Sequence, residues 1–345
     1  LRDAVLGGTA PERILATTFT NRAADELLER GRERLLGEGR AEEALRLMLA
    51  RIGTVNRVFG HMVGEFALEQ GRSPVAAVMP EGAQTRLFRI AADGVIGRHA
   101  PVLAALADRF GFTEGQANQQ TDWRKVLADM VGVARLNGLG REDLTASAER
   151  SWSTLRSALP TPEKTAEALD AALAETVEDA LSVLGEGDGT KTTNTAIAAL
   201  EDARRILSRP ASAPWSAWAR LSKVAAAKAL DGAVAPVRKA AAAHPRHPRL
   251  HQDLETFICT IFAGAGEALE EAQAFKRRRG LVDFVDQEAE ALALLADAPV
   301  AARVAAGTDL LLVDEFQDTS PIQLALFMRL AGLVPRTLFV GDPKQ

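Results

Sequence analysis

The chain has 345 residues, enough for more than one compact unit, and its apolar and charged contents are ordinary for a soluble globular protein. Its formal net charge of −5 excludes a general attraction to nucleic acid, so any DNA contact must come from local patches. One cysteine, Cys259, excludes an internal disulfide framework, and its apolar neighbours predict a buried thiol. We expect no membrane span, because no run approaches about 20 apolar residues, and no signal peptide, because Arg2 and Asp3 are charged.

The first part of the chain alternates between strand and helix signals. The apolar, β-rich segment Arg13–Phe19 predicts a buried strand, and Asn21 is a suitable N-cap for the helix that follows. A second short strand is expected over Ile52–Val55. The segment His61–Gln70 then predicts a helix that ends at Gly71, a typical C-cap residue.

The texture changes near Ser73, where alanine-rich helical spacing begins and continues to about Arg279. Strand signals return at Asp309–Val313 and Leu338–Gly341. The helix between these strands has a clear start, with Ser320 as N-cap, Pro321 in the first position and Gln323 completing a capping box. The simplest architecture is an α/β domain with a parallel sheet, formed by residues 1–72 and 281–345 and interrupted by an all-helical insertion over 73–280.

The strongest chemical signal is the strand Leu310–Val313, which delivers two adjacent carboxylates, Asp314 and Glu315, to its C-terminal end. Open α/β sheets bind ligands at that end of their strands. Phosphoryl transfer needs one carboxylate near Mg²⁺ and another group that positions the attacking water, and Gln317 could bond the terminal phosphate. By itself the pattern is equally compatible with an acidic strand end that leads into a capped helix.

Two further strand ends carry polar turns. Thr17–Ala24 combines hydroxyls, Phe19 and a helix N-terminus, which can hold a nucleic-acid phosphate while the aromatic ring stacks on an unpaired base. The alternative is a threonine-rich turn with Phe19 in the core. The segment Leu338–Gln345 taken alone is an ordinary Gly-Asp-Pro turn.

The order of these motifs resembles the helicases of the UvrD/Rep family. Thr18–Ala24 is similar to the family's first single-strand contact motif, Asp314–Asp318 to its Mg²⁺ and hydrolysis box, and Gly341–Gln345 to its coupling motif. Thr319–Gln323 and Lys276–Asp286 look more like the AddA/RecB branch than UvrD itself. The resemblance covers both α/β ends well, and the helical middle only by position and length.

The resemblance implies a RecA-like motor domain of the P-loop NTPase type that uses ATP and Mg²⁺. Glu315, Asp314 and Gln317 would be catalytic, and Asp314 would hold Mg²⁺ through water. Asp314, Asp342 and Gln345 would contact the nucleotide. The DNA contacts implied are Thr18, Phe19, Thr20, Asn21, Thr54 and Asn56.

The sequence departs from the family pattern at two places. Asn56 stands where the family usually has a histidine that touches DNA, which makes that contact less secure. The phosphate-binding loop should precede Leu1, so we expect a fragment that is inactive by itself. The segment Gly185–Thr192 resembles such a loop, but Thr190 replaces a required glycine and the neighbours are helical, which favours an interhelix loop.

The whole protein implied by this resemblance is a cytoplasmic helicase that moves 3′-to-5′ on single-stranded DNA in double-strand-break repair. Its partners would be single-stranded DNA, duplex ends and a second subunit of an AddAB- or RecBCD-like complex, without a membrane. A nuclease domain is left open. The alternatives are a plain UvrD-type helicase without nuclease and an inactive DNA-binding subunit of a repair complex. A small-molecule kinase would not explain the flanking motifs.

Three other groups of residues have structural interpretations. The histidines His244, His247 and His251 lie among prolines and predict a solvated basic linker rather than a metal site. The basic run Lys276–Arg279 predicts a solvated turn. The four tryptophans are expected to pack in helical cores; these are Trp123, Trp152, Trp215 and Trp218.

Overall fold

Four strands pair in parallel in one sheet, in the order β2-β1-β5-β6. The computed structural model describes residues 1–69, 71, 77–112, 121–185, 188–210, 213–342 and 344, apart from the side chain of Glu81. The strands are β1 (Ile14–Thr18), β2 (Arg51–Thr54), β5 (Leu310–Val313) and β6 (Arg336–Phe339). The prediction that segments from both ends of the chain form one parallel sheet is confirmed.

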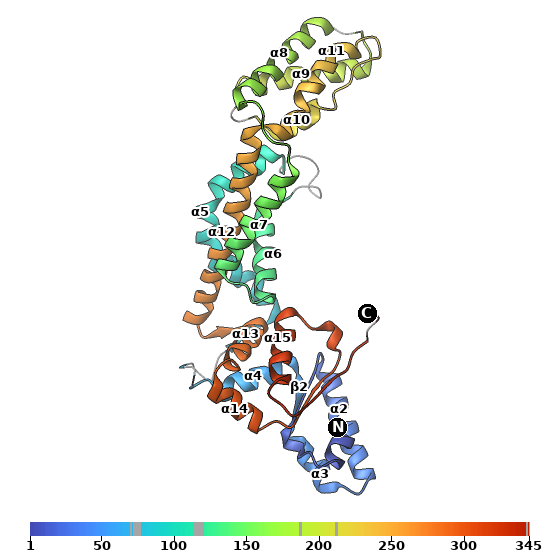
Figure 1. Ribbon diagram of the computed structural model, residues 1–345, viewed down its shortest axis with the longest axis vertical. Helices are drawn as coiled ribbons and strands as arrows, with labels where there is room; N and C mark the ends of the chain where they lie inside the picture. The colour runs from blue at the N-terminus through green and yellow to red at the C-terminus, as the bar shows by residue number, and fades with distance from the viewer. Residues whose placement is uncertain are drawn as a thin grey trace. The chain divides into compact units, whose positions relative to one another are not determined.

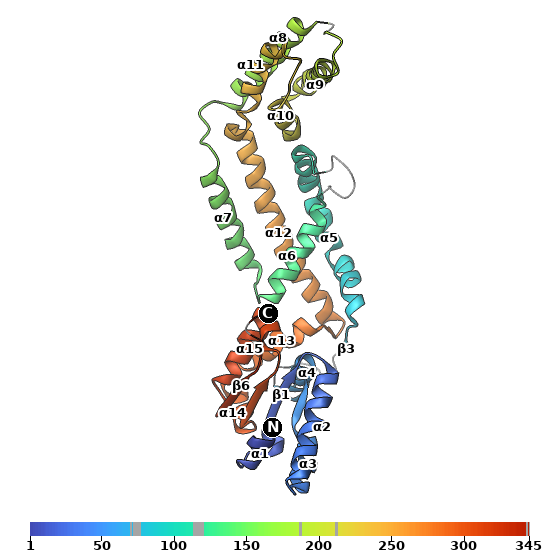
Figure 2. The ribbon, with the colours of Figure 1, turned by 90° about the vertical axis from the view of Figure 1, so that its right-hand side faces the viewer.

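Helices cover both faces of this sheet, as Figure 2 shows with α14 and α15 on one side and α2 and α3 on the other. Successive strand residues point to opposite faces, so Leu15 and Leu311 enter one core while Ile14 and Leu310 enter the other. The elements around the sheet are α1 (Arg2–Leu6), η1 (Pro11–Arg13), α2 (Asn21–Gly37), α3 (Ala41–Arg46), η2 (Leu47–Leu49), α4 (Val55–Glu65), α13 (Phe284–Leu294), α14 (Ala298–Ala306), η5 (Phe316–Asp318) and α15 (Pro321–Ala331).

Local capping sets the first turns of these helices. The expected capping box of α15 is present, because Ser320 accepts from Gln323 N and Gln323 accepts from Ser320 N. Two other boundaries differ from expectation. Thr20, and not Asn21, caps α2 by accepting from Ala23 N at 3.1 Å. In α4, Thr54 is the N-cap, so this helix begins well before the expected residue.

The middle of the chain is helical, and from Glu81 to Arg278 the described residues form no strand. This confirms the expected helical insertion over these residues, although the expected range 73–280 also includes the short strand described next. Two short strands, β3 (Ala77–Val78) and β4 (Leu281–Val282), flank these helices in the sequence and pair in parallel. The helices of the insertion are α5 (Glu81–Phe110), α6 (Trp123–Leu136), α7 (Arg141–Ala158), α8 (Ala166–Leu184), α9 (Lys191–Leu207), α10 (Trp215–Leu221), α11 (Asp231–Ala241), η4 (His244–Arg246) and α12 (Pro248–Arg278).

The chain divides into two compact units, and their boundaries differ from residues 72/73 and 280/281. The first unit comprises Leu1–Ala91, Val133–Leu139 and Glu271–Gln345. The second comprises Ala92–Gly132 and Gly140–Glu270. Three of the boundaries fall inside α5, α6 and α12, because each of these helices contributes turns to both units, and the fourth lies between α6 and α7.

The long helix α5 modifies the expectation that no segment could cross a membrane. By length and composition, Gly82–Phe110 is apolar enough to do so. Core helices of soluble proteins pass the same test, so a single such helix is weak support for a membrane span.

The second unit contains a helical cluster formed by α8, α9, α10 and α11 (Figure 1). Its core buries Trp215 and Trp218, and Trp123 and Trp152 are buried as well, so the expectation for the tryptophans is confirmed. Of the segment Gly185–Thr192, residues 186 and 187 lie outside the described residues. Gly185 ends α8 and Thr190 caps α9, which begins at Lys191, as expected for an interhelix loop.

The histidine segment is not a solvated linker, because His247 is completely buried. Its ring packs edge-on against Trp215 and Trp218, and Nε2 lies 3.3 Å from Asp170 Oδ1. Burial lowers the pKa of His247, against the effect of the nearby Asp170 carboxylate. Among the described residues no group of three or more potential ligands could hold a metal ion. The partner Asp170 is distant in sequence, so the local pattern gave no sign of it.

The expected burial of Cys259 is wrong, since this residue is exposed on α12. Its neighbours Phe257 and Ile258 are half-buried, but successive helical residues lie on different faces. Partial burial still raises the pKa of the thiol, with Glu255 and Glu149 adding to the effect. The thiol is therefore poorly activated as a nucleophile.

The core of the second unit should depend on Trp218, which is only 1% exposed. Trp218→Ala is expected to lower the free energy of unfolding by about 3–5 kcal/mol, because a large cavity replaces the indole. Urea unfolding followed by circular dichroism measures this. Val183→Ala on the exposed face of α8 is the control and should change stability by less than about 0.5 kcal/mol. Equal losses in both variants would contradict the assigned core.

Candidate functional site

The strand register brings three polar turns to one edge of the sheet. Thr17 pairs with Val313, and Val313 pairs with Phe339. The alignment continues beyond the strands, because Asp314 N donates to Thr17 O at 3.0 Å and Val340 N donates to Val313 O at 2.8 Å. The residues that follow β1, β5 and β6 therefore emerge together, as expected for parallel strands.

The loop after β5 holds Glu315 in an unusual backbone conformation. With φ 54° and ψ 42°, Glu315 is the only non-glycine residue with positive φ in the part of the chain that the structure describes. The next residue is fixed from the neighbouring strand, because Phe316 N donates to Val340 O at 2.8 Å. The ring of Phe316 also stacks on Phe339, with centroids 4.4 Å apart. These contacts stabilise a left-handed residue that costs roughly 1–2 kcal/mol.

Gln317 connects the loop after β5 to the turn after β6. Its Nε2 donates to Glu315 Oε2 at 2.7 Å, and its Oε1 accepts from Asp342 N at 3.0 Å. Both ends of the carboxamide are therefore engaged within the protein, and the expected contact with a phosphate stays a prediction. Asp342 lies in the same turn, where Oδ1 accepts from Lys344 N at 2.8 Å. Gln345 lies outside the described residues.

The donor set at this edge fits a hard divalent cation bound through water. Asp314 is half-buried, and its Oδ1 accepts from Glu315 N at 3.1 Å. Among the described residues, no hydrogen bond or ion pair involves Asp314 Oδ2. Carboxylate oxygens suit Mg²⁺, which keeps several of its own waters. The residues present therefore fit the implied Mg²⁺.

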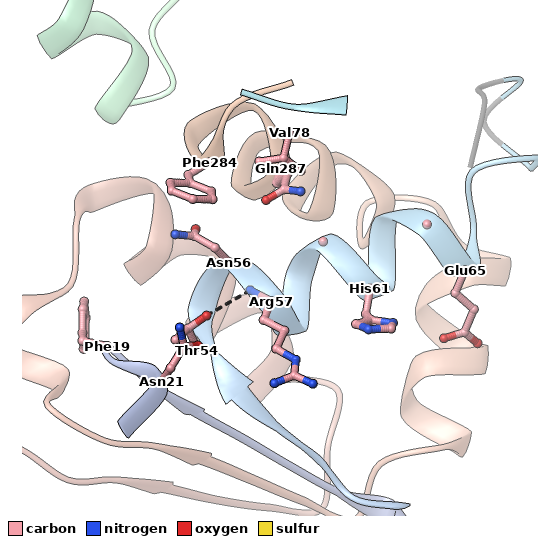
Figure 3. A pocket seen from close by; sticks show the side chains of 12 residues that line it. Phe19, Asn21, Thr54, Asn56, Arg57, His61, Glu65, Val78, Phe284 and Gln287 are labelled. Carbon is pink, nitrogen blue, oxygen red and sulfur yellow. Dashed lines mark hydrogen bonds between the residues drawn. The ribbon is translucent and has the colours of Figure 1, made fainter. Parts of the chain in front are cut away.

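A second feature of the first unit is an open cavity of ≈ 880 Å³ beside the ends of β1 and β2. Figure 3 shows the Phe284 ring lying above the Asn56 carboxamide, with Phe19 on another side of the hollow. Polar and apolar groups both contribute to the lining. The lining residues are Phe19, Asn21, Thr54, Asn56, Arg57, Gly60, His61, Gly64, Glu65, Val78, Phe284 and Gln287.

Four of the six residues expected to contact DNA line this cavity: Phe19, Asn21, Thr54 and Asn56. Phe19 is half-buried, so it is not a core residue. Asn56 Oδ1 is buried and has no hydrogen-bond partner among the residues that the structure describes. The other two have internal roles. Thr18 is fully buried and donates to Thr20 O at 2.9 Å. Thr20 caps α2.

Several lining residues were not predicted from the sequence, including Arg57, His61 and Phe284. Arg57 and His61 are four residues apart on α4 and are exposed, whereas the next residues, Val58 and Met62, lie on a different face and are buried. This polar stripe, interrupted by glycines, was the feature of the sequence that could have indicated an exposed binding face on α4. A side chain at Gly60 would lie 2.9 Å from Gln287 Nε2, so the glycine permits close approach of α13.

A buried charge cluster fixes the first turn of α13, directly before Phe284. Asp283 caps this helix and forms a capping box with Asp286. Lys276 Nζ lies 3.0 Å from Asp283 Oδ2 and 2.5 Å from Asp286 Oδ2, and Arg135 Nη2 contacts Asp283 Oδ1 at 2.5 Å. Burial opposes ionisation of Asp283, but Arg135 and Lys276 together hold its pKa below the usual value.

This cluster corrects the expectation for the basic run Lys276–Arg279. Lys276 is 4% exposed and paired, whereas the three arginines that follow are exposed. The run is therefore divided, and only its second part is a solvated turn. The cluster positions Phe284 at the cavity.

The same helix is attached to α15 by a buried hydrogen bond. Glu288 is 3% exposed and accepts from Gln323 Nε2 at 2.6 Å. Burial raises the pKa of Glu288, against the effect of the Gln323 hydrogen bond. Since Gln323 also completes the capping box of α15, one residue connects the helix beside the cavity to the helix that follows the acidic strand end.

Comparison with known protein families identifies the family of this chain. The family model of the UvrD/REP helicase N-terminal domain matches residues 5–202 and 252–345. The chain belongs to this family. The matched ranges include all four strands of the sheet.

Two relatives place the chain near one branch of the UvrD/REP family. A segment of 79 residues is 43% identical to an ATP-dependent helicase/nuclease subunit of Latilactobacillus sakei subsp. sakei (strain 23K), covering 22% of this chain and 9% of that protein. A segment of 119 residues is 34% identical to RecBCD enzyme subunit RecB of Escherichia coli (strain K12), covering 31% and 10%. The matches span about a tenth of each relative. The resemblance to the UvrD/Rep family and its AddA/RecB branch is confirmed.

The buried Glu288 should make the stability of this UvrD/REP domain depend on pH. Its folded pKa is raised above the usual value for a glutamate, so the native state holds the proton more tightly. The stabilisation of the native state by the protonated Glu288 is full below the pKa of the unfolded state. It is lost as the pH rises through the pKa of the folded state. Glu288→Gln keeps an acceptor for Gln323 and removes the titration. Relative to the parent, the variant should therefore gain stability as the pH rises above the usual pKa of a glutamate.

Thermal unfolding across this range measures the difference. Glu290→Gln, on the same helix, is the matched control. Parallel curves for the parent and Glu288→Gln would show that the carboxyl group does not titrate there.

Proposed function

We propose that the full-length protein is a DNA-dependent ATPase and helicase that moves 3′-to-5′ on single-stranded DNA. One observation carries the proposal. The acidic strand end and the cavity-lining strand end are joined by the hydrogen bond from Asp314 N to Thr17 O. A nucleotide at the first site and DNA at the second would thus share one rigid sheet edge. Membership of the UvrD/REP family supports this interpretation.

The acidic strand end would carry the hydrolytic chemistry. Asp314 would hold Mg²⁺ through water, and the bound ion would neutralise charge on the phosphates of ATP. Glu315 Oε1 and Oε2 would orient the attacking water and accept its proton. Asp342 and Gln345 would contact the nucleotide from the turn after β6. We also propose that residues 1–345 alone do not turn over ATP, because no described glycine-rich loop joins a strand to a helix as a phosphate cradle would.

The cavity would form part of the track for single-stranded DNA. Phe19 and Phe284 offer aromatic faces to unpaired bases, and Arg57 offers a positive charge to the backbone. Among the described residues, the buried Asn56 Oδ1 has no hydrogen-bond partner, so a base amino group that reaches it would satisfy it. Asparagine can therefore serve where the family usually has histidine.

The two relatives support a proposal for the biological setting, because their names describe subunits of larger enzymes. We propose that this protein acts at duplex ends in double-strand-break repair, in the cytoplasm, with a second subunit of the AddAB or RecBCD kind. The retained pair Asp314 and Glu315 favours an active motor over an inactive DNA-binding subunit.

Glu315→Gln in the full-length protein should nearly abolish ATP hydrolysis while leaving ATP and DNA binding intact. Glutamine matches glutamate in size but cannot accept the proton, so turnover should fall by about 10²- to 10⁴-fold. Steady-state ATPase assays with single-stranded DNA measure the effect. Turnover at the parental rate would remove the catalytic role of the acidic strand end.

Asp314→Asn is the informative companion. Loss of this carboxylate should weaken Mg²⁺ and therefore nucleotide affinity as well as turnover. Nucleotide titration at several Mg²⁺ concentrations separates the two variants. Excess Mg²⁺ should partly restore Asp314→Asn but not Glu315→Gln.

Phe19→Ala and Phe284→Ala should each weaken binding to single-stranded DNA by about 1–3 kcal/mol, the typical value for one stacked base. Fluorescence anisotropy with a labelled oligonucleotide measures affinity at fixed salt. Phe275→Ala is the matched control, because this half-buried phenylalanine of α12 is not among the cavity residues. If all three variants bind equally well, the cavity is not part of the DNA track.

A further inference from the structure

The carboxamide of Gln317 is held at both ends by groups that belong to different strand ends. Nε2 donates to Glu315 Oε2 at 2.7 Å, and a longer contact of 3.5 Å reaches Asp318 Oδ2. Oε1 accepts from Asp342 N at 3.0 Å. This arrangement needs a side chain that donates at one end and accepts at the other, which a carboxamide does and a carboxylate does not.

The turn after β6 is shaped to admit this side chain. A Cβ atom at Gly341 would lie 2.6 Å from Gln317 Oε1 and 3.2 Å from Phe316 N. Real Cβ atoms essentially never approach so closely, so any side chain at Gly341 would displace the carboxamide or the turn. The absence of a side chain at this position is therefore what leaves room for the Gln317 carboxamide against the turn.

Apart from this bond from Gln317, the side chain of Glu315 is weakly restrained. Its side chain is exposed, and its backbone is in the left-handed region, where it is fixed through its neighbours Asp314 and Phe316. The bond from Gln317 is the one hydrogen bond that the described residues donate to the Glu315 carboxylate. Without this bond the carboxylate could rotate among its rotamers, and general-base geometry requires hydrogen-bond reach to the attacking water.

We propose that Gln317 is a positioning residue: it fixes the Glu315 carboxylate and ties it to the backbone of the Gly341–Asp342 turn. This inference rests on the proposed ATPase function. It assigns Gln317 a role through Glu315 rather than through a direct contact with phosphate. Any shift of the turn after β6 would move the carboxylate with it, because the two are joined by a single rigid amide.

The first test is Gln317→Ala in the full-length protein. Turnover should fall by up to about 10²-fold, the effect of a misplacement of about 1 Å. The KM and the dissociation constant for ATP should stay at the parental values. Gln252→Ala, at an exposed glutamine of α12, is the matched control and should change neither. A weaker ATP affinity with unchanged turnover would instead identify Gln317 as a phosphate ligand and overturn the proposal.

A double-mutant cycle with Glu315→Gln decides between the two roles. If Gln317 acts through the Glu315 carboxylate, Gln317→Ala should cost nothing further once that carboxylate is gone. If Gln317 acts independently, the two losses should multiply, and the proposal fails. Glu315→Gln alone tests the proposed function. If Glu315→Gln hydrolyses ATP at the parental rate, the proposed ATPase site is refuted, whatever the result for Gln317→Ala.

Gly341→Ala reaches the same bond from the other side. It should lower turnover in the parent but add much less in the Gln317→Ala background, where the carboxamide that it displaces is missing. Thermal unfolding of each variant checks that the domain is folded. Equal losses from Gly341→Ala in both backgrounds would show that the glycine serves the turn alone, and that the link from Gln317 to this turn has no catalytic effect.

Discussion

The parallel register of β1, β5 and β6 is the constraint on which both sites depend. It is set by burial, because Leu311 and Val313 enter one core while Leu310 and Leu312 enter the other. Because both faces are apolar, a slip of one residue would exchange them and leave each side chain in a space shaped for another. The core therefore fixes, to within a residue, where each polar turn leaves the sheet. Hydrogen bonds between the strand ends then extend the same register into the loops that carry Asp314 and Gly341.

Features encoded by neighbouring residues could be predicted from the sequence. The capping box at Ser320 and Gln323 needs only a four-residue window, and the strand ending in Asp314 and Glu315 needs only an apolar run. The predicted first residues of some helices nevertheless differ from those in the structure. A polar residue before a helix can serve as N-cap or as the first helical residue, and Thr20 took the position expected for Asn21 because its hydroxyl reaches Ala23 N.

Features that depend on partners distant in sequence could not be predicted. Lys276 looked like part of a solvated basic run, yet it is buried beside Asp283 together with Arg135, which lies in another helix. His247 looked like a linker residue, but its partner Asp170 lies on α8. The cavity shows the same limit. The lining residues that follow β1 and β2 could be predicted from the strand ends. Phe284 could not, because it follows the helical insertion in the sequence.

The left-handed conformation of Glu315 shows how the fold and the chemistry constrain one another. Glycine would adopt φ 54° without a Cβ penalty, so a structural role alone would favour glycine there. A glutamate in this position costs stability, and the fold offsets that cost through the Phe316–Phe339 stack and the bond from Phe316 N to Val340 O. A strained residue so over-determined by its neighbours is typical of a site where the side chain must point in one direction. The strain explains why the backbone turns toward the sheet edge. It does not by itself fix the carboxylate, which is why a second device, the Gln317 amide, is needed.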